Sequence, residues 1–157
     1  MKVKILAVGK TGEKFWSDAV AEYSKRLSRF CNFTIEEIPD LKNPDLSSTE
    51  LCRKTIEKEG ESILRRIKDE VVVALCIEGK QMKSEDLCSL IEDAAMKNGR
   101  LTFVIGGSLG LSDAVKNRAD FRLSMSKMIF PHALARVMLA EQIYRAYTIM
   151  NNGNYHK

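Results

Sequence analysis

The two histidines of this chain, His132 and His156, both lie in its last third, among other residues that could do chemistry. An imidazole can donate or accept a proton near neutral pH, and it is the commonest general acid or base in enzymes. Arg136 lies one helical turn after His132, so the two side chains share a helix face. Tyr155 precedes His156 near the end of the sequence, where a packing role is hard to assign.

A glycine turn in the same region could hold a ligand. Residues 103–105 predict an apolar strand, and residues 106–110 (GGSLG) follow it, where backbone amides can approach a ligand closely. The spacing is not G-x-G-x-x-G, and no acidic residue closes a following strand, so a dinucleotide site is rejected. Gly9-Lys10-Thr11 imitates the end of a P-loop, but the glycine required five positions earlier is Lys4. Room for an adenosine-sized ligand remains, with a plain tight turn as the alternative.

The segment at residues 126–130 (SKMIF) is unusual because its last three residues are apolar and precede Pro131. Proline prevents the segment from continuing as a strand or a helix. A buried loop must satisfy its own backbone donors and acceptors, and the edge of a purine can use such groups. The segment is therefore interpreted as a ligand-binding loop, with ordinary packing as the alternative.

Length and composition predict one domain over residues 1–157. No apolar run approaches the roughly 20 residues that span a bilayer, so no membrane partner is expected. The first residues do not form a signal peptide. Four widely spaced cysteines and two histidines make a metal site improbable and favour reduced thiols in a cytoplasmic protein. Cys76 and Cys88 are both expected in the core.

The excess of positive charge is confined to one part of the chain. Residues 1–99 hold 17 Lys and Arg against 18 Asp and Glu, whereas residues 100–157 hold 8 against 3. The basic residues of the second part could line the path of an anionic substrate, although scattered solvated charge is an equal alternative. They are Arg100, Lys116, Arg118, Arg122, Lys127, Arg136, Arg145 and Lys157.

Strand and helix patterns alternate along the chain. Strands are predicted at residues 2–8, 33–38, 70–77, 101–105 and 121–125, and helices at 15–27, 47–67, 84–99, 112–118 and 131–151. Ser47 and Ser84 are expected to cap the second and third helices. This order predicts an α/β fold with an open, mainly parallel sheet and helices on both faces. Ligands bind beyond the carboxyl ends of such strands, which places the exits after Leu75, Ile105 and Met125 together.

The last predicted helix is apolar nearly all round, so it must be buried in the core or against a second subunit.

Together, the motifs of this sequence resemble those of the RlmH family of SPOUT-class methyltransferases, over essentially the whole length of the chain. The motifs are ILAVGK at 5–10, KEGE at 58–61, FVIGGSLG at 103–110, SKMIFPH at 126–132, RV at 136–137, EQIYRA at 141–146 and YHK at 155–157.

The resemblance implies a deep C-terminal trefoil knot, a homodimer in the cytoplasm, and S-adenosylmethionine as the methyl donor. It implies methylation at N3 of a pseudouridine in the ribosomal RNA of the large subunit, on assembled ribosomes, with no metal. The residues that it assigns to the cofactor are Leu75, Gly106, Met125, Ser126, Lys127, Met128, Ile129 and Phe130. Those that would position or help to deprotonate the target base are His132, Arg136, Tyr155 and His156.

Two other functions remain open from the sequence. A binding module would hold an adenosine ligand without methyl transfer. A structural protein of the ribosome would bind RNA through the basic last third and ignore the cofactor.

Overall fold

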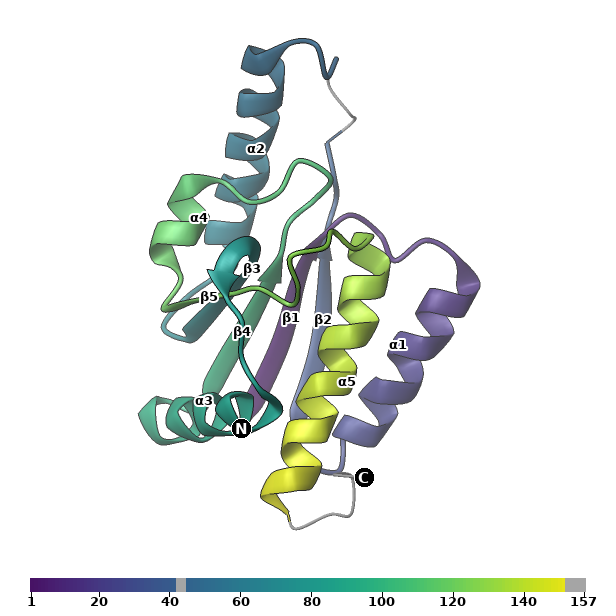
Figure 1. Ribbon diagram of the computed structural model, residues 1–157, viewed down its shortest axis with the longest axis vertical. Helices are drawn as coiled ribbons and strands as arrows, with labels where there is room; N and C mark the ends of the chain where they lie inside the picture. Colours follow the sequence, from purple (N-terminus) through teal and green to yellow (C-terminus); the bar gives the residue numbers. More distant parts are fainter. Residues whose placement is uncertain (42–44, 152–157) are drawn as a thin grey trace.

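The computed structural model describes residues 1–41 and 45–151, which contain a five-stranded parallel sheet (Figure 1). Its strands are β1 (Lys2–Val8), β2 (Asn32–Ile38), β3 (Val71–Lys80), β4 (Arg100–Ile105) and β5 (Phe121–Leu123). They lie in the order β2-β1-β4-β3-β5, and every adjacent pair is parallel. All five strands therefore end at the same edge of the sheet, hereafter the carboxyl edge.

Five helices connect or follow these strands: α1 (Lys14–Leu27), α2 (Thr49–Leu64), α3 (Ser84–Lys97), α4 (Asp113–Arg118) and α5 (His132–Met150). α1 and α3 each pack against α5 on one face, and α2 and α4 cover the other. The two connections through α1 and α3 lead toward the β2 side of the sheet. The two connections through α2 and α4, on the opposite face, lead toward the β5 side. All four connections thus have one hand, as parallel sheets require. The predicted fold class is confirmed.

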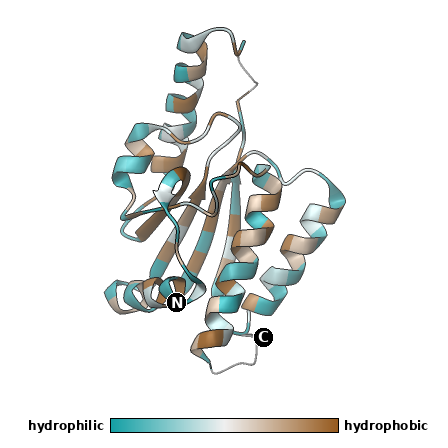
Figure 2. Ribbon diagram, viewed as in Figure 1, coloured by the Kyte–Doolittle hydropathy of each residue, from teal (hydrophilic) through white to brown (hydrophobic). Residues whose placement is uncertain are grey.

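The central strands are apolar on both sides because helices cover both (Figure 2). On the α1/α3/α5 face, Val3, Ile5 and Phe103 belong to the larger core cluster. On the α2/α4 face, Leu6 and Val104 belong to the smaller one. The sheet is therefore a rigid base for whatever lies at its carboxyl edge.

Two predicted helix caps are each displaced by one residue. The Ser48 hydroxyl caps α2 by accepting from the Leu51 amide at 3.4 Å. Ser47 instead donates to the Asp45 carboxylate at 2.7 Å, which takes it out of the capping position. Ser84 is the first residue of α3 and not its cap. Helix ends of this kind depend on competing local hydrogen bonds that spacing alone does not rank.

α5 is buried along its whole length, as its largely apolar composition predicts. Each residue from 132 to 150 is buried or half-buried, because α1 and α3 flank the helix above the sheet. Figure 1 shows α5 and α1 side by side. The knot implied by the resemblance stays a prediction. No helix within the described ranges is both long and apolar enough to cross a membrane.

We expect Gly60→Ala to destabilise the protein, although alanine is the better helix former by about 1 kcal/mol. A Cβ at this position would overlap the Ser112 hydroxyl and lie 2.9 Å from the Ser112 Cβ, where α2 meets α4. Overpacking of this kind costs about 1 to 3 kcal/mol. Thermal unfolding of Gly60→Ala beside Glu61→Ala, its exposed neighbour on α2, measures the effect. A Gly60→Ala protein as stable as the wild type would show that the two helices separate freely.

Candidate functional site: a cavity at the carboxyl edge of the sheet

A cavity of about 800 Å³ opens at the carboxyl edge, where β3, β4 and β5 end. This volume is in the range of small-molecule sites in proteins. Three segments that are distant in the sequence form its walls: the end of β3, the glycine turn after β4, and the segment from β5 to the start of α5. The lining residues are Leu75–Glu78, Ile105–Leu111, Lys116, Leu123–Ser126, Met128–His132 and Ala135. The three exits chosen from the sequence thus meet in one cavity.

The first wall is a bulge of β3. Both Leu75 and Lys80 pair with Leu123 of β5, so the four residues between them project from the sheet. Gly79 permits this, because a Cβ there would lie 2.6 Å from the Leu123 carbonyl carbon. The bulge brings Cys76 to the cavity, and the prediction that Cys76 lies in the core is wrong. Cys88 is buried, as predicted.

Sequence reasoning also missed an ion pair on this side of the cavity. The Lys116 ammonium group of α4 lies 2.5 Å from the Glu78 carboxylate of the β3 bulge, and both residues line the cavity. The hydrogen bond from Lys116 is the main cause that lowers the pKa of Glu78. A polar residue followed by glycine at the end of an apolar strand was the available signal for a bulge.

The second wall is the glycine turn, which is closed on itself. Gly107 and Gly110 form an isolated antiparallel bridge, and the Gly110 amide donates to the Gly107 carbonyl at 3.0 Å. A Cβ on Gly106 would lie 2.7 Å from the carbonyl carbon and oxygen of Gly110. Gly106 is therefore required because the two sides of the turn touch. The backbone of the turn faces the cavity with little side chain in between.

The third wall is the loop between β5 and α5. Ser126 organises it, since its carbonyl accepts from the Ser124 hydroxyl at 2.9 Å and its own hydroxyl accepts from the Met128 amide at 3.0 Å. Met128 is 69% exposed and Ile129 is 81% exposed. The loop is therefore not buried, contrary to the sequence interpretation, and its apolar side chains stand at the mouth of the cavity. Lys127 is not among the lining residues.

The first turn of α5 brings one catalytic candidate to the cavity. His132 lines it and is half-buried. A Cβ on Gly9, in the turn after β1, would lie 3.7 Å from the His132 Nε2 atom. The imidazole therefore lies close to the β1–α1 turn as well as at the cavity.

Arg136 does not line the cavity, because its side chain is fully buried and directed toward the end of β1 and the turn after it. Its Nη2 atom donates to the carbonyls of Val8 and Gly9 at 2.9 and 2.7 Å. Its Nη1 atom donates to Thr11 Oγ1 at 2.9 Å and to Glu37 Oε1 at 2.8 Å. We therefore propose that Arg136 positions His132 and does not contact the substrate. The other two catalytic candidates, Tyr155 and His156, lie outside the described residues.

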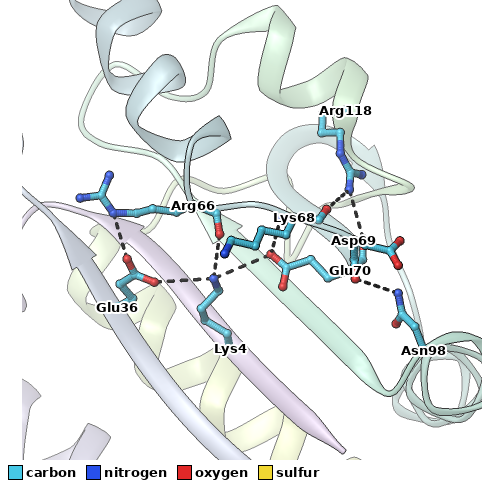
Figure 3. Close-up of polar contacts among 8 residues, drawn as sticks. All are labelled: Lys4, Glu36, Arg66, Lys68, Asp69, Glu70, Asn98 and Arg118. Atoms are coloured by element: carbon cyan, nitrogen blue, oxygen red, sulfur yellow. Dashed lines mark hydrogen bonds and ion pairs between the residues drawn. The ribbon is translucent and has the colours of Figure 1, made fainter.

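The basic residues of the last third do not form one path. Arg100 begins β4 at the edge opposite the cavity. Arg118 donates to the backbone carbonyls of Lys68 and Glu70, just before β3, at 2.9 and 3.3 Å (Figure 3). Arg145 pairs with Glu141, one helical turn before it on α5, at 3.0 Å. Among these eight basic residues, only Lys116 lines the cavity within the described part of the chain. The structure therefore favours the alternative of scattered charge, because most of the described cations serve internal contacts.

A cluster of charged side chains lies on the α2/α4 face, away from the cavity (Figure 3). The Lys4 ammonium group lies 3.6 Å from Glu36 and 3.7 Å from Glu70, and it donates to the Arg66 carbonyl at 3.1 Å. Arg66 in turn lies 2.9 Å from Glu36. The two cations, Lys4 and Arg66, balance the two carboxylates, Glu36 and Glu70, so we assign this cluster to stability and not to binding.

We expect Glu37→Gln to lower the free energy of unfolding by about 2 to 3 kcal/mol at neutral pH, since it leaves the Arg136 charge buried without a counterion. This is less than the usual cost of about 3 to 5 kcal/mol for breaking a buried ion pair, because the Glu37 side chain is 36% exposed. Burial alone would raise the pKa of Glu37, but the Thr11 hydroxyl and amide and the Arg136 charge lower it below the usual 4.5.

A lowered carboxyl pKa stabilises the folded state above the unfolded pKa and ceases to do so as pH falls through the folded value. The difference between wild type and Glu37→Gln should therefore persist down to about pH 4.5 and shrink below it. Urea unfolding at neutral and acidic pH measures it. A difference that is constant with pH would mean that charge is not the cause.

Among the described residues, no three His, Cys, Asp or Glu side chains gather in a way that could hold a metal ion. The cavity instead combines apolar walls, an exposed glycine backbone, the Lys116–Glu78 ion pair and one imidazole. This combination is suited to an organic ligand held by its shape and by a few polar and backbone groups.

Residues 1–156 match the model of a methyltransferase family that is described as predicted SPOUT methyltransferase. The chain belongs to that family, which confirms the resemblance drawn from the motifs. Relatives named ribosomal RNA large subunit methyltransferase H include one from Clostridium perfringens and one from Bifidobacterium adolescentis, each 50% identical over 159 aligned positions. One from Streptococcus pneumoniae is 48% identical, and each match covers the whole of both chains.

Solved structures support the fold. A probable methylase family protein from Haemophilus influenzae superimposes with a TM-score of 0.53, over 99% of this chain and 70% of that chain. A probable methyltransferase from Bordetella pertussis gives a TM-score of 0.55 over 92% and 95%. Both are 12% identical to this chain, so the likeness is one of architecture.

Proposed function

We propose that this protein transfers a methyl group from S-adenosylmethionine to N3 of a pseudouridine in the ribosomal RNA of the large subunit. The observation that carries the proposal is the cavity in which the ends of β3, β4 and β5 meet. Full-length relatives at about half identity, named as large-subunit methyltransferases, support the choice of RNA. On the same ground we propose that the protein acts in the cytoplasm of a bacterial cell.

The residues at the cavity fit this donor. Its volume of about 800 Å³ suits an adenosine with an attached amino acid. Leu75 and Met125 supply apolar walls, and the backbone of Gly106 and Gly107 can face the ligand without side chains between. We assign donor binding to Leu75, Gly106, Met125, Ser126, Met128, Ile129 and Phe130, as the resemblance implies. Lys127 stays a prediction from the resemblance alone.

The donor, when bound, supplies an electrophilic methyl group on a sulfonium. The chain has to hold the target base in line with it and accept the imide proton of that base. His132 is placed to do this at the cavity wall, and Arg136 holds the first turn of α5 in place. Tyr155 and His156 remain candidates for stacking on the base and for hydrogen bonding to its edge.

We further propose a homodimer in which the outer side of α5 meets a second copy. Val137→Glu should shift the protein to monomer or aggregate, because the new carboxylate would be buried without a partner. Val137 is half-buried and lies on a helix in which each residue is at least half-buried, so its side chain is already partly shielded from water. Sedimentation of wild type and Val137→Glu at micromolar concentration measures the change. A monomeric wild type would contradict the proposal.

The decisive experiment is incubation with methyl-labelled S-adenosylmethionine and, separately, free ribosomal RNA, large subunits and whole ribosomes. Label in N3-methylpseudouridine supports the proposed function, and the three substrates show which form is recognised. Saturable donor binding without label in any RNA would support a binding module instead. RNA binding without donor binding would support a structural role in the ribosome.

A further inference from the structure

Glu59 is a buried carboxyl group on a helix whose other acidic residues are exposed. It is 6% exposed, whereas Glu50, Glu57 and Glu61 of α2 lie at the surface. None of the ion pairs among the described residues includes Glu59. A buried carboxyl group without a cation is costly, so its position calls for a reason.

The Glu59 carboxyl group joins two loops at the carboxyl edge. Its Oε1 atom accepts from the Leu41 amide, in the loop after β2, at 3.1 Å. Its Oε2 atom lies 3.1 Å from the point where a Cβ on Gly107 would be, and Val8 Cγ1 lies 3.2 Å from the same point. The carboxyl group thus packs directly against the glycine turn after β4.

The two loops would not otherwise be joined through neighbouring strands. β2 and β4 are separated by β1 in the sheet, so Glu59 reaches across the end of β1 at Val8. Gly107 lines the cavity on its other side. Only the backbone of one glycine therefore separates the Glu59 carboxyl group from the cavity.

Burial raises the pKa of Glu59, and the neighbouring charge of Asp40 raises it further against the opposing hydrogen bond from Leu41. The neutral form is thereby favoured relative to a solvated carboxyl group. A glutamine at this position would resemble that form in shape and would still accept a hydrogen bond from the Leu41 amide.

We propose that Glu59 is a positioning residue of the donor site, which holds the glycine turn in the shape that S-adenosylmethionine requires by clamping it to the loop after β2. This inference rests on the proposed donor. What matters for the clamp is the reach of the side chain and its acceptor for Leu41, and not its charge. Glu59 does not touch the ligand.

Two substitutions separate reach from charge. Glu59→Gln keeps the reach and the acceptor but removes the charge, whereas Glu59→Asp keeps the charge but is one methylene too short. Calorimetry with S-adenosylmethionine and with S-adenosylhomocysteine gives the dissociation constants. We expect Glu59→Asp to weaken both by about tenfold, as for one lost hydrogen bond, and Glu59→Gln to stay within about threefold of the wild type. Glu61→Asp and Glu61→Gln, on the exposed side of α2, are the matched controls and should bind as the wild type does.

Thermal unfolding without ligand distinguishes the clamp from a role in stability alone. Lower unfolding temperatures with unchanged affinities would overturn the proposal, and so would a Glu59→Asp protein that binds like the wild type. Weak binding by Glu59→Gln would overturn it too, since charge would then be the essential property. A wild type that binds neither ligand would instead refute the proposed function on which the inference rests.

Discussion

We expect Gly106→Val to abolish measurable S-adenosylmethionine binding while the protein stays folded. A Cβ on Gly106 would meet the Gly110 carbonyl group at 2.7 Å, and the two further methyl groups of valine enlarge the overlap. The turn must open, and with it the backbone of residues 107–110 that lines the cavity. We expect a loss of affinity of at least about a hundredfold, near 3 kcal/mol. Calorimetry gives the affinity, and circular dichroism confirms folding.

We attribute the expected loss of affinity to steric overlap of the new side chain and not to backbone strain at residue 106. Gly106 is not among the glycines with positive φ, which in the described residues are Gly9, Gly12, Gly99 and Gly110. Gly12→Ala is therefore an informative control, because it strains the backbone at φ 83° with nothing within 4 Å of the new Cβ. It should leave donor affinity unchanged. A folded Gly106→Val protein with the affinity of the wild type would remove the glycine turn from the site.

We expect His132→Ala to lower the rate of methyl transfer about a hundredfold while donor affinity changes little, because general base catalysis of this kind contributes about a hundredfold or more. The imidazole lines the cavity beside the β1–α1 turn, so its loss leaves the walls after β3 and β4 in place. Single-turnover methylation of ribosomes gives the rate of the chemical step, and calorimetry gives the affinity for the donor.

His132→Gln separates the two roles open to this side chain. Glutamine keeps a hydrogen-bonding group at the cavity but cannot accept a proton at neutral pH. A Gln variant as slow as His132→Ala would support proton transfer, and a Gln variant close to the wild type would limit His132 to positioning the base. Full activity of both variants would exclude His132 from the reaction.

Local sequence patterns were sufficient for the architecture of the sheet. An unbroken, β-branched apolar run such as residues 71–75 is typical of a strand covered on both faces, and parallel strands end at a common edge. The exits after Leu75, Ile105 and Met125 could therefore be placed together before their contacts were known. The resemblance then supplied the identity of the ligand, which no periodicity contains.

The parts that escaped prediction depend on contacts distant in the sequence. The bulge that brings Cys76 to the cavity exists because β5 pairs with Leu75 and again with Lys80. The role of Arg136 depends on acceptors that come from the first strand and the turn after it. Glu59 was noticed only as part of a family motif, since nothing local predicts that its carboxyl group reaches the glycine turn. Such pairings become visible only when the chain is folded.

Arg136 and its backbone acceptors are far apart in the sequence, so the acceptors are synthesised well before Arg136. Val8 and Arg136 are 128 residues apart, so a ribosome adding about 5 to 20 residues per second needs about 6 to 25 s to go from one to the other. Throughout that interval the carbonyls of Val8 and Gly9 lack the guanidinium that receives them in the finished fold. The nascent chain can build β1 and α1 early, but the wall that carries His132 cannot form until α5 has been translated.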